Sequence, residues 1–364
     1  MMTADQKKIK SCSLGNRILE VPVIQGGMGV GISLGGLAGA VMREGGMGVI
    51  SAADPGFDEP DYYTNALEAN CRALAAQVRK ARHLSCGHGL LGVNVMVACC
   101  HYEELVQAAV EAGADAIVSG AGLPMNLPAI PGTENVLLAP IVSSGKAARL
   151  LMQAWMRHHG RLPDFIVVEG PLAGGHLGFK REDLDSGNVQ TLEEIVPDVL
   201  AETAKIEELT GQHIPVVAAG GIMNGADMAR FLKIGAGAVQ LGTRFIAASE
   251  CDASDGFVNA ILDATPEDIR LVKSPTGLPG RAVTTELIER AEEGRIPPVR
   301  CIRCIKKCNP ATTPYCITEA LVNAQRGNIA EGLVFCGARA GELHKRSSVH
   351  EIMTELTTEC EENL

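Results

Sequence analysis

The chain has 364 residues, with 32 Lys and Arg against 43 Asp and Glu and a formal net charge of −11 at pH 7. This acidic balance argues against binding of nucleic acid or of an anionic membrane surface, because both require basic patches. No window approaches 18 uninterrupted apolar residues, so we expect no membrane span. Residues 1–20 lack the apolar region of a secretory signal, so we expect a cytoplasmic protein.

Glycine and cysteine stand out in the composition. The chain holds 41 glycines among 364 residues, about one in nine, whereas the usual level is roughly 7%. Only 3% of its residues are aromatic, so we expect an aliphatic core. It also holds 12 cysteines. In a cytosolic chain, cysteines are more often reduced thiols or metal ligands than disulfides.

Short β-branched runs alternate with segments of helical periodicity, which is typical of βαβ units around a parallel sheet. The expected strands are 21–26, 47–52, 91–97, 116–120, 138–143, 165–169, 215–219 and 238–243. The expected helices are 33–44, 65–83, 102–112, 146–158, 191–210 and 225–234, with no helix over 123–133. Eight strands favour an α/β fold of the closed (β/α)8, or TIM, barrel type over an open doubly wound sheet.

The alternation stops after Phe245. We therefore expect two parts. The first is the barrel with its substrate site over residues 15–285, and the second is a cysteine-bearing, partly helical C-terminal extension over residues 286–364.

Glycine-rich segments follow several expected strands. The first has glycines at 27, 29 and 31, which lacks the G-x-G-x-x-G spacing of a dinucleotide fingerprint and fits either a tight turn or bare backbone under a flat ligand. The pairs Gly220-Gly221 and Gly242-Thr243 follow the seventh and eighth strands, where barrels often bind phosphate. The alternative is that these glycines only turn the chain.

One histidine follows the sixth expected strand. His176 lies in the segment Gly174-Gly175-His176, at the carboxyl end of that strand, where barrel enzymes carry their active sites. Imidazole exchanges a proton near neutral pH, so His176 is a candidate acid/base. The alternative is an ordinary solvated loop histidine.

Five short segments in chain order resemble the nitronate monooxygenase family, which includes the FMN-dependent type II enoyl-ACP reductases. They are VPVIQGGMG, LGVNVMV, LAGGHLGF, PVVAAGGIMNG and AVQLGTRF, and the resemblance covers residues 15–285. It implies a TIM barrel with non-covalent FMN, Gly27 and Met28 against the flavin ring and Asn94 bonded to it. It further implies FMN contacts from Gly174, Gly220, Gly221, Gln240, Leu241, Gly242 and Thr243, and from Lys146 after the fifth strand. His176 matches the family histidine that removes the α-proton of alkyl nitro compounds.

The segment before the histidine departs from the family pattern. Members usually show G-x-E-A-G-G-H, often with a preceding Gln, whereas this chain has Glu169 at the Gln position and Leu172 at the acidic position. This departure weakens the transfer of the family's substrate to this chain. It does not affect the implied FMN site, because the glycine-rich phosphate segments are intact.

Four cysteines within 16 residues form the pattern C-x2-C-x3-C-x7-C: Cys301, Cys304, Cys308 and Cys316. The pattern lacks the paired C-x2-C spacing of zinc sites, and two- and three-residue gaps are common around iron–sulfur clusters. The quartet also resembles the one that binds [4Fe-4S] in 2,4-dienoyl-CoA reductases. The interpretations are a [4Fe-4S] cluster, a zinc site, or thiols without metal.

Three functions compete at this point. The first is a nitronate monooxygenase with His176 as base, and the second is an enoyl (acyl-ACP or acyl-CoA) reductase supplied with electrons by NAD(P)H or through the cluster. The third is a non-enzymatic flavin or metal redox sensor. We expect a small-molecule or acyl-thioester partner and a homo-oligomer. The choice between NADH and NADPH stays open.

Overall fold

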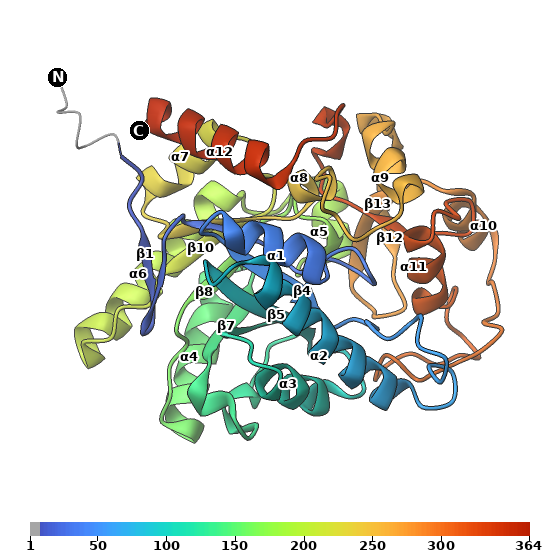
Figure 1. Cartoon of the computed structure of the whole chain (residues 1–364), viewed down its shortest axis with the longest axis horizontal. Coiled ribbons are helices and arrows are strands. Elements are labelled where there is room, and N and C mark those ends of the chain that lie inside the picture. The colour runs from blue at the N-terminus through green and yellow to red at the C-terminus, as the bar shows by residue number, and fades with distance from the viewer. Residues whose placement is uncertain (1–7) are drawn as a thin grey trace.

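The computed structural model describes residues 8–364. Eight parallel strands form a closed barrel (Figure 1), with neighbours in the order β10-β11-β3-β4-β5-β6-β7-β8. The strands are β3 (Val23–Gln25), β4 (Met47–Ser51), β5 (Leu90–Met96), β6 (Ala116–Gly120), β7 (Leu137–Val142), β8 (Ile166–Glu169), β10 (Val216–Ala219) and β11 (Ala238–Leu241). Each predicted strand is present, and the predicted TIM barrel is confirmed.

Helices connect the strands on the outside of the barrel. They are α1 (Gly35–Arg43), α2 (Ala66–Leu84), α3 (Tyr102–Glu111), α4 (Gly145–His159), α6 (Leu192–Thr210), α7 (Gly225–Ile234) and the short α8 (Thr243–Ile246). The connection over 123–133 contains only 3-10 turns, η2 (Leu127–Ala129) and η3 (Thr133–Asn135), as the sequence predicts. Ser144 and Asn224 cap the N-termini of α4 and α7. The side chain of each accepts a hydrogen bond from the backbone N–H three residues later, that of Ala147 and that of Asp227.

A hairpin that the sequence analysis did not predict closes the amino end of the barrel. Strands β1 (Cys12–Leu14) and β2 (Arg17–Leu19) pair antiparallel. Leu14 and Leu19 are fully buried and pack with Phe165 among the aliphatic side chains inside the barrel. The opposite, carboxyl end of the strands is therefore the open end.

A second sheet lies beyond the barrel strands and was also not predicted. It pairs β12 (Ile269–Lys273) with β13 (Pro279–Val283), and β13 with β14 (Val334–Phe335) and β9 (Gly175–His176). The predicted boundary between residues 285 and 286 separates β14 from the other three strands of this sheet in the sequence. The remaining elements are α5 (Arg181–Ser186), α9 (Asp255–Leu262), η4 (Pro266–Asp268), α10 (Glu286–Glu293), α11 (Ile317–Gln325), η5 (Ala340–Glu342) and α12 (Val349–Asn363).

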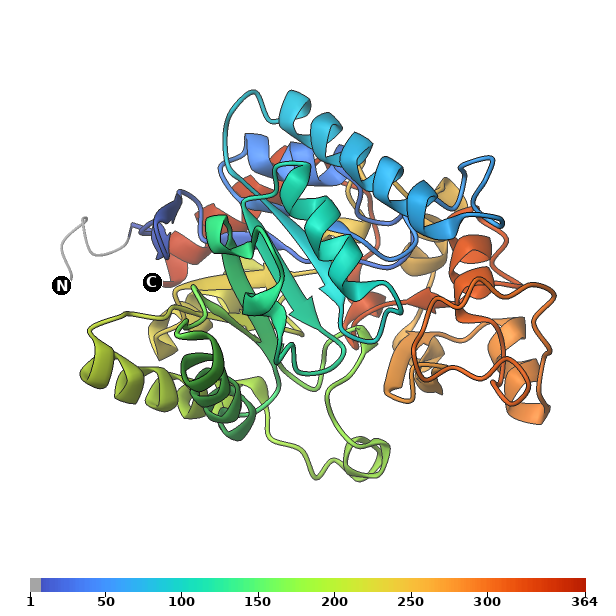
Figure 2. The ribbon, with the colours of Figure 1, turned by 90° about the horizontal axis from the view of Figure 1, so that it is seen from below.

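Strands β12 and β13 of the second sheet, α10 and α11 gather at one side of the barrel, drawn in orange to red-orange in Figures 1 and 2. The chain then returns along the barrel as α12, which packs against α7 and α1. Ile352, Met353 and Leu356 of α12 join the core between the strands and the outer helices. Among residues 8–364, no helix is long and apolar enough to cross a membrane.

Candidate active site

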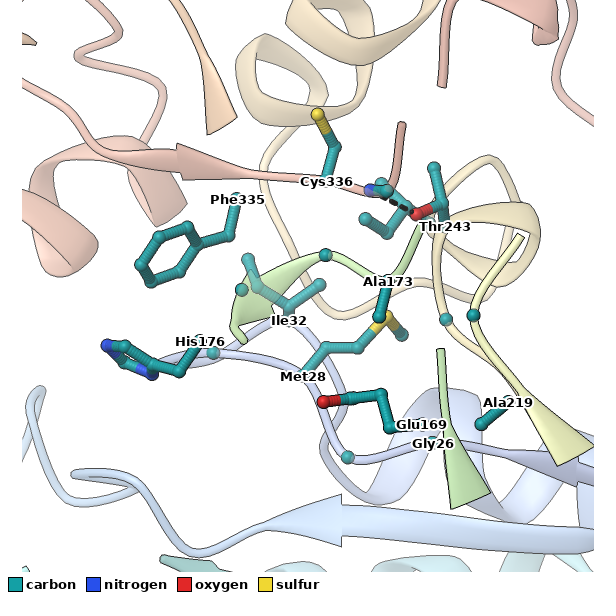
Figure 3. Close-up of a pocket in the computed structure, with 18 of the residues that line it drawn as sticks. Gly26, Met28, Ile32, Glu169, Ala173, His176, Ala219, Thr243, Phe335 and Cys336 are labelled. Carbon is teal, nitrogen blue, oxygen red and sulfur yellow. Dashed lines mark hydrogen bonds between the residues drawn. The ribbon is translucent and has the colours of Figure 1, made fainter. Parts of the chain in front are cut away.

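A cavity opens at the carboxyl ends of the barrel strands (Figure 3), and we call it the main cavity. Eleven of the residues predicted from the sequence line it: Gly27, Met28, Asn94, Gly174, His176, Gly220, Gly221, Gln240, Leu241, Gly242 and Thr243. They come from the ends of different strands, which the closed barrel brings together. Lys146 does not line this cavity; it is exposed in the first turn of α4.

Bare backbone forms much of the wall of the main cavity. At Gly27 an added Cβ would lie 2.4 Å from the Asn94 Cβ, so no larger residue fits there without displacing β5. Gly220 and Gly221 have φ angles of +95° and +84°, a region that favours glycine. Their peptide groups thus border the cavity without side chains between them and a ligand.

One buried polar atom in the wall has no partner. Oε1 of Gln240 is enclosed and accepts no hydrogen bond from the part of the chain that the structure describes. A buried acceptor without a donor costs on the order of 1–3 kcal/mol. A ligand that donates a hydrogen bond to Gln240 would remove this cost, so the wall is suited to a polar, flat group such as a flavin ring.

The C-terminal extension covers the end of the main cavity near β11. The Gly337 N–H donates to Oγ1 of Thr243 over 2.8 Å, the contact dashed in Figure 3. Arg339 also lines the cavity and donates to the Gly221 carbonyl over 2.8 Å and to Asp227. The sequence analysis missed both residues, because nothing in their local pattern indicates that they return to the barrel.

His176 is held by the second sheet. Its backbone pairs with Gly280 of β13, its Nε2 lies 2.8 Å from Oγ of Ser274, and its ring meets that of Phe335 edge-on at 5.1 Å. Nδ1 has no hydrogen-bond partner within residues 8–364. Burial lowers the pKa of His176 to about 4, so the ring is neutral at pH 7 and can accept a proton.

Glu169 ends β8 inside the main cavity, and Figure 3 shows its carboxyl group directed into the space beside Met28. Burial raises its pKa to about 8, and the charge of Arg281 opposes this shift. Glu169 is therefore mostly protonated at pH 7 and can donate a hydrogen bond. The sequence analysis noted this residue only as a departure from the family pattern.

A second cavity, the middle cavity, adjoins the main one. His176 and Met96 line both. The larger apolar side chains of its wall come from distant segments: Leu67, Leu105, Ile302, Ile305, Ile317 and Leu321. The polar residues of the wall are Asp54, Asn70, His101 and Thr318, and Asp54 is hydrogen-bonded to Asn70 and Thr318. The available space at the barrel mouth therefore extends beyond His176 along an apolar surface.

The four cysteines of the predicted quartet line a third cavity, the cysteine cavity, together with Cys100. Cys100 belongs to the loop after β5, and its N–H donates to the Cys304 carbonyl over 2.9 Å. Among residues 8–364, no three His, Cys, Asp or Glu side chains lie close enough together to hold a single metal ion.

The sequence pattern described as nitronate monooxygenase matches residues 13–359. The (3aS,4S,5R,7aS)-5-hydroxy-7a-methyl-1-oxo-octahydro-1H-indene-4-carboxyl-CoA dehydrogenase of Mycobacterium tuberculosis is 27% identical over 276 residues, covering 76% of this chain and 66% of that protein. The nitronate monooxygenase of Paraburkholderia phytofirmans is 28% identical over 205 residues, covering 55% and 50%. The matches thus span 66% and 50% of these curated relatives' length.

Two solved structures resemble the whole chain. FabK from Thermotoga maritima superposes with a TM-score of 0.72 at 25% identity, covering 94% of each chain. Nitroalkane oxidase from Streptomyces ansochromogenes also gives a TM-score of 0.72, at 21% identity, covering 95% of this chain and 97% of that one. The second likeness is one of fold.

Proposed function

The chain belongs to the nitronate monooxygenase family of flavin-dependent oxidoreductases, and we propose that it holds FMN, the flavin typical of that family, in the main cavity. The glycine-lined wall and the unpartnered Gln240 acceptor support this proposal. Gly27, Met28 and Asn94 would border the flavin ring. Gln240 would accept a hydrogen bond from the flavin ring through Oε1. The phosphate and the atoms next to it would meet the backbone of Gly220, Gly221 and Gly242, the hydroxyl of Thr243 and the neighbouring Leu241 and Gly174.

FMN supplies two-electron chemistry at its ring, and the protein supplies binding, orientation and proton transfer. His176 is neutral, held from one side by Ser274, and has its Nδ1 free of protein partners within residues 8–364. In the oxidative direction it can thus take the α-proton from a substrate carbon beside an electron-withdrawing group. In the direction of C=C reduction it would first take up a proton from solvent and then donate it to that carbon. The Ser274 hydroxyl, which also pairs with Thr276 at 3.0 Å, fixes the orientation of the ring.

We propose an acyl thioester as the substrate, with NAD(P)H as the reductant in the direction of C=C reduction. The observation that carries this proposal is the middle cavity, which continues from His176 with a largely apolar wall and a volume of about 50 Å³, room for the first carbons of an acyl chain beyond the main cavity. The Mycobacterium tuberculosis relative is a carboxyl-CoA dehydrogenase, which agrees with a thioester substrate.

An alkyl nitronate is the second candidate, supported by the relative from Paraburkholderia phytofirmans. It would use the same proton transfer at His176, with O2 as the second substrate. A small nitronate has no use for the middle cavity, which is the feature that separates the two candidates.

The experiment compares turnover of enoyl-CoA substrates of increasing chain length, under anaerobic conditions with NAD(P)H, with turnover of alkyl nitronates and O2. We expect kcat/KM to rise with acyl length. Leu67→Trp, which fills the middle cavity from α2, should lower kcat/KM for long chains at least about tenfold and spare the four-carbon enoyl-CoA.

Leu84→Trp, at the exposed end of the same helix, is the matched control. It should change kcat/KM neither for long-chain nor for four-carbon enoyl-CoA. Efficient nitronate oxidation with no enoyl-CoA turnover would reject the thioester and establish the second candidate.

A further inference from the structure

The cysteine cavity is assembled from two parts of the chain that are far apart in sequence. Residues 300–308 lie against the loop after β5 through two backbone hydrogen bonds, Cys100 N–H to Cys304 O and Lys306 N–H to Ala98 O, which together form an antiparallel bridge between Cys99 and Ile305. Cys316 enters from the start of α11. The thiols of the quartet therefore surround one space.

The spacing of the thiols matters more than their number. A single zinc ion needs four ligand atoms within about 2.0–2.3 Å of one point, and no three candidate ligands in residues 8–364 approach each other in that way. An iron–sulfur cluster carries its cysteines around its outer corners. The described residues therefore hold no preformed site for a single ion at the cysteine cavity, whereas a [4Fe-4S] cluster would be bound by one thiol at each of its four irons.

The charges around the cavity suit a negatively charged guest. Arg300, Arg303 and Lys306 line it together with the cysteines, against one acidic residue, Glu319. The backbone at Arg303 adopts a left-handed conformation with φ of +56°, and its N–H points at the Cys301 sulfur over 3.4 Å. Hydrogen bonds to the sulfurs and nearby cations are among the features that stabilise and tune such clusters.

We propose that Cys301, Cys304, Cys308 and Cys316 bind a [4Fe-4S] cluster in the cysteine cavity, with Cys100 beside the cluster but not bound to iron. Cys304 lines both the cysteine cavity and the middle cavity, and His176 lines both the middle and the main cavity. The cluster site and the proposed FMN site therefore flank the same middle cavity. The cluster proposal rests on the cysteines and does not require the acyl-thioester substrate.

The experiment is anaerobic purification of the full chain, followed by reconstitution with ferrous iron and sulfide and by measurement of iron, acid-labile sulfide, zinc and flavin. We expect about four iron and about four sulfide per chain. We also expect a broad visible absorbance beneath the flavin bands and, after reduction with dithionite, a low-temperature electron paramagnetic resonance signal of the one-electron-reduced cluster.

Cys304→Ser and Cys308→Ser should each lose most of the iron while their flavin content stays at the wild-type level, which shows that the barrel remains folded. Cys100→Ser and the control Cys86→Ser, at an exposed site, should keep the iron. Zinc in place of iron, or free thiols without metal after reconstitution, would overturn the proposal. Iron loss in Cys100→Ser equal to that in Cys304→Ser would overturn the assigned ligands. Flavin content decides the FMN proposal separately.

Discussion

In the removal of an α-proton, the oxidative direction, His176 acts as the base, and this role depends on its being neutral. Burial lowers its pKa to about 4, whereas an exposed histidine titrates near 6.5. Activity that depends on the neutral ring is therefore retained until the pH falls toward 4. We expect kcat/KM for oxidation of the saturated acyl thioester, in which His176 takes the α-proton, to be level between pH 5 and pH 7. An inflection near 6.5 in the wild-type profile would show that the ring titrates as an ordinary histidine and would contradict this account.

Replacement of His176 removes the proton acceptor without touching the glycine-lined wall. For His176→Ala we expect a loss of about 10²–10⁴-fold in kcat, the usual contribution of a positioned acid or base, with flavin content unchanged. Steady-state kinetics and a flavin measurement on the same sample check this. Turnover equal to that of the wild type would leave His176 a structural residue.

Glu169 is the second titrating group in the cavity. Its carboxyl has a pKa raised to about 8, so the protonated form dominates at pH 7 and is lost as the pH rises through 8. Because an unfolded glutamate titrates near 4.3, the folded state becomes less stable relative to the unfolded state as the pH rises from about 4 to 8. Glu169→Gln should remove this slope from the free energy of unfolding, measured by urea denaturation at several pH values. A slope equal to that of the wild type would contradict the assignment.

Arg281 illustrates how an element outside the barrel holds the site. From β13, its Nη1 donates to the carbonyls of Pro171 over 2.7 Å and Ala173 over 2.5 Å, in the segment just before His176. It also opposes the raised pKa of Glu169. Arg281→Met should therefore raise that pKa further and lower kcat, as a pH profile would detect. Arg270→Met, at an exposed position of the neighbouring strand β12, is the control. An identical effect of both substitutions would show that Arg281 has no specific role in holding the site.

The hairpin β1–β2 should contribute to stability rather than to catalysis. Leu19 is fully buried at the amino end of the barrel, and Leu19→Ala should lower the free energy of unfolding by about 2–5 kcal/mol. Ile18→Ala, 63% exposed on the same strand, should change it by less than about 0.5 kcal/mol. Urea denaturation compares the two, and equal effects would show that the hairpin does not close the core.

The barrel elements were predictable because each has a local pattern. The β-branched runs that became β5 and β8 and the capped helices α4 and α7 are visible within short windows of sequence. Strands β9 and β14 have only two residues each and find their partners across distant segments, so no window carries their periodicity. Ser274, Phe335 and Arg281, which surround His176, escaped sequence analysis for the same reason.

At the scale of the whole molecule, three cavities lie next to one another at the barrel mouth. The main cavity contains the predicted glycine positions, the middle cavity is apolar, and the cysteine cavity contains the quartet. The strand-end rule of barrels predicted His176 and the glycine-rich segments after the seventh and eighth strands in the first cavity. Other lining residues, such as Met28 and Asn94, were implied by the family resemblance. The middle cavity was not predictable, because its wall joins α2, α3 and α11 with the segment around Ile302, and only tertiary packing brings these together.

The central claim is that FMN lies in the main cavity with its phosphate end near Gly242. An added Cβ at Gly242 would lie 3.5 Å from the Met28 sulfur, an ordinary contact, so Gly242→Ala should fold normally yet place a methyl group in the cavity. The matched control is Gly294→Ala, where an added Cβ meets nothing within 4 Å.

Titration of the flavin-free chain with FMN, followed by flavin fluorescence, tests this claim most directly. We predict about one FMN bound per wild-type chain, unchanged affinity in Gly294→Ala, and affinity at least about tenfold weaker in Gly242→Ala, a difference of about 1.4 kcal/mol. Failure of the wild type to bind FMN, or equal affinity in all three chains, would contradict the account.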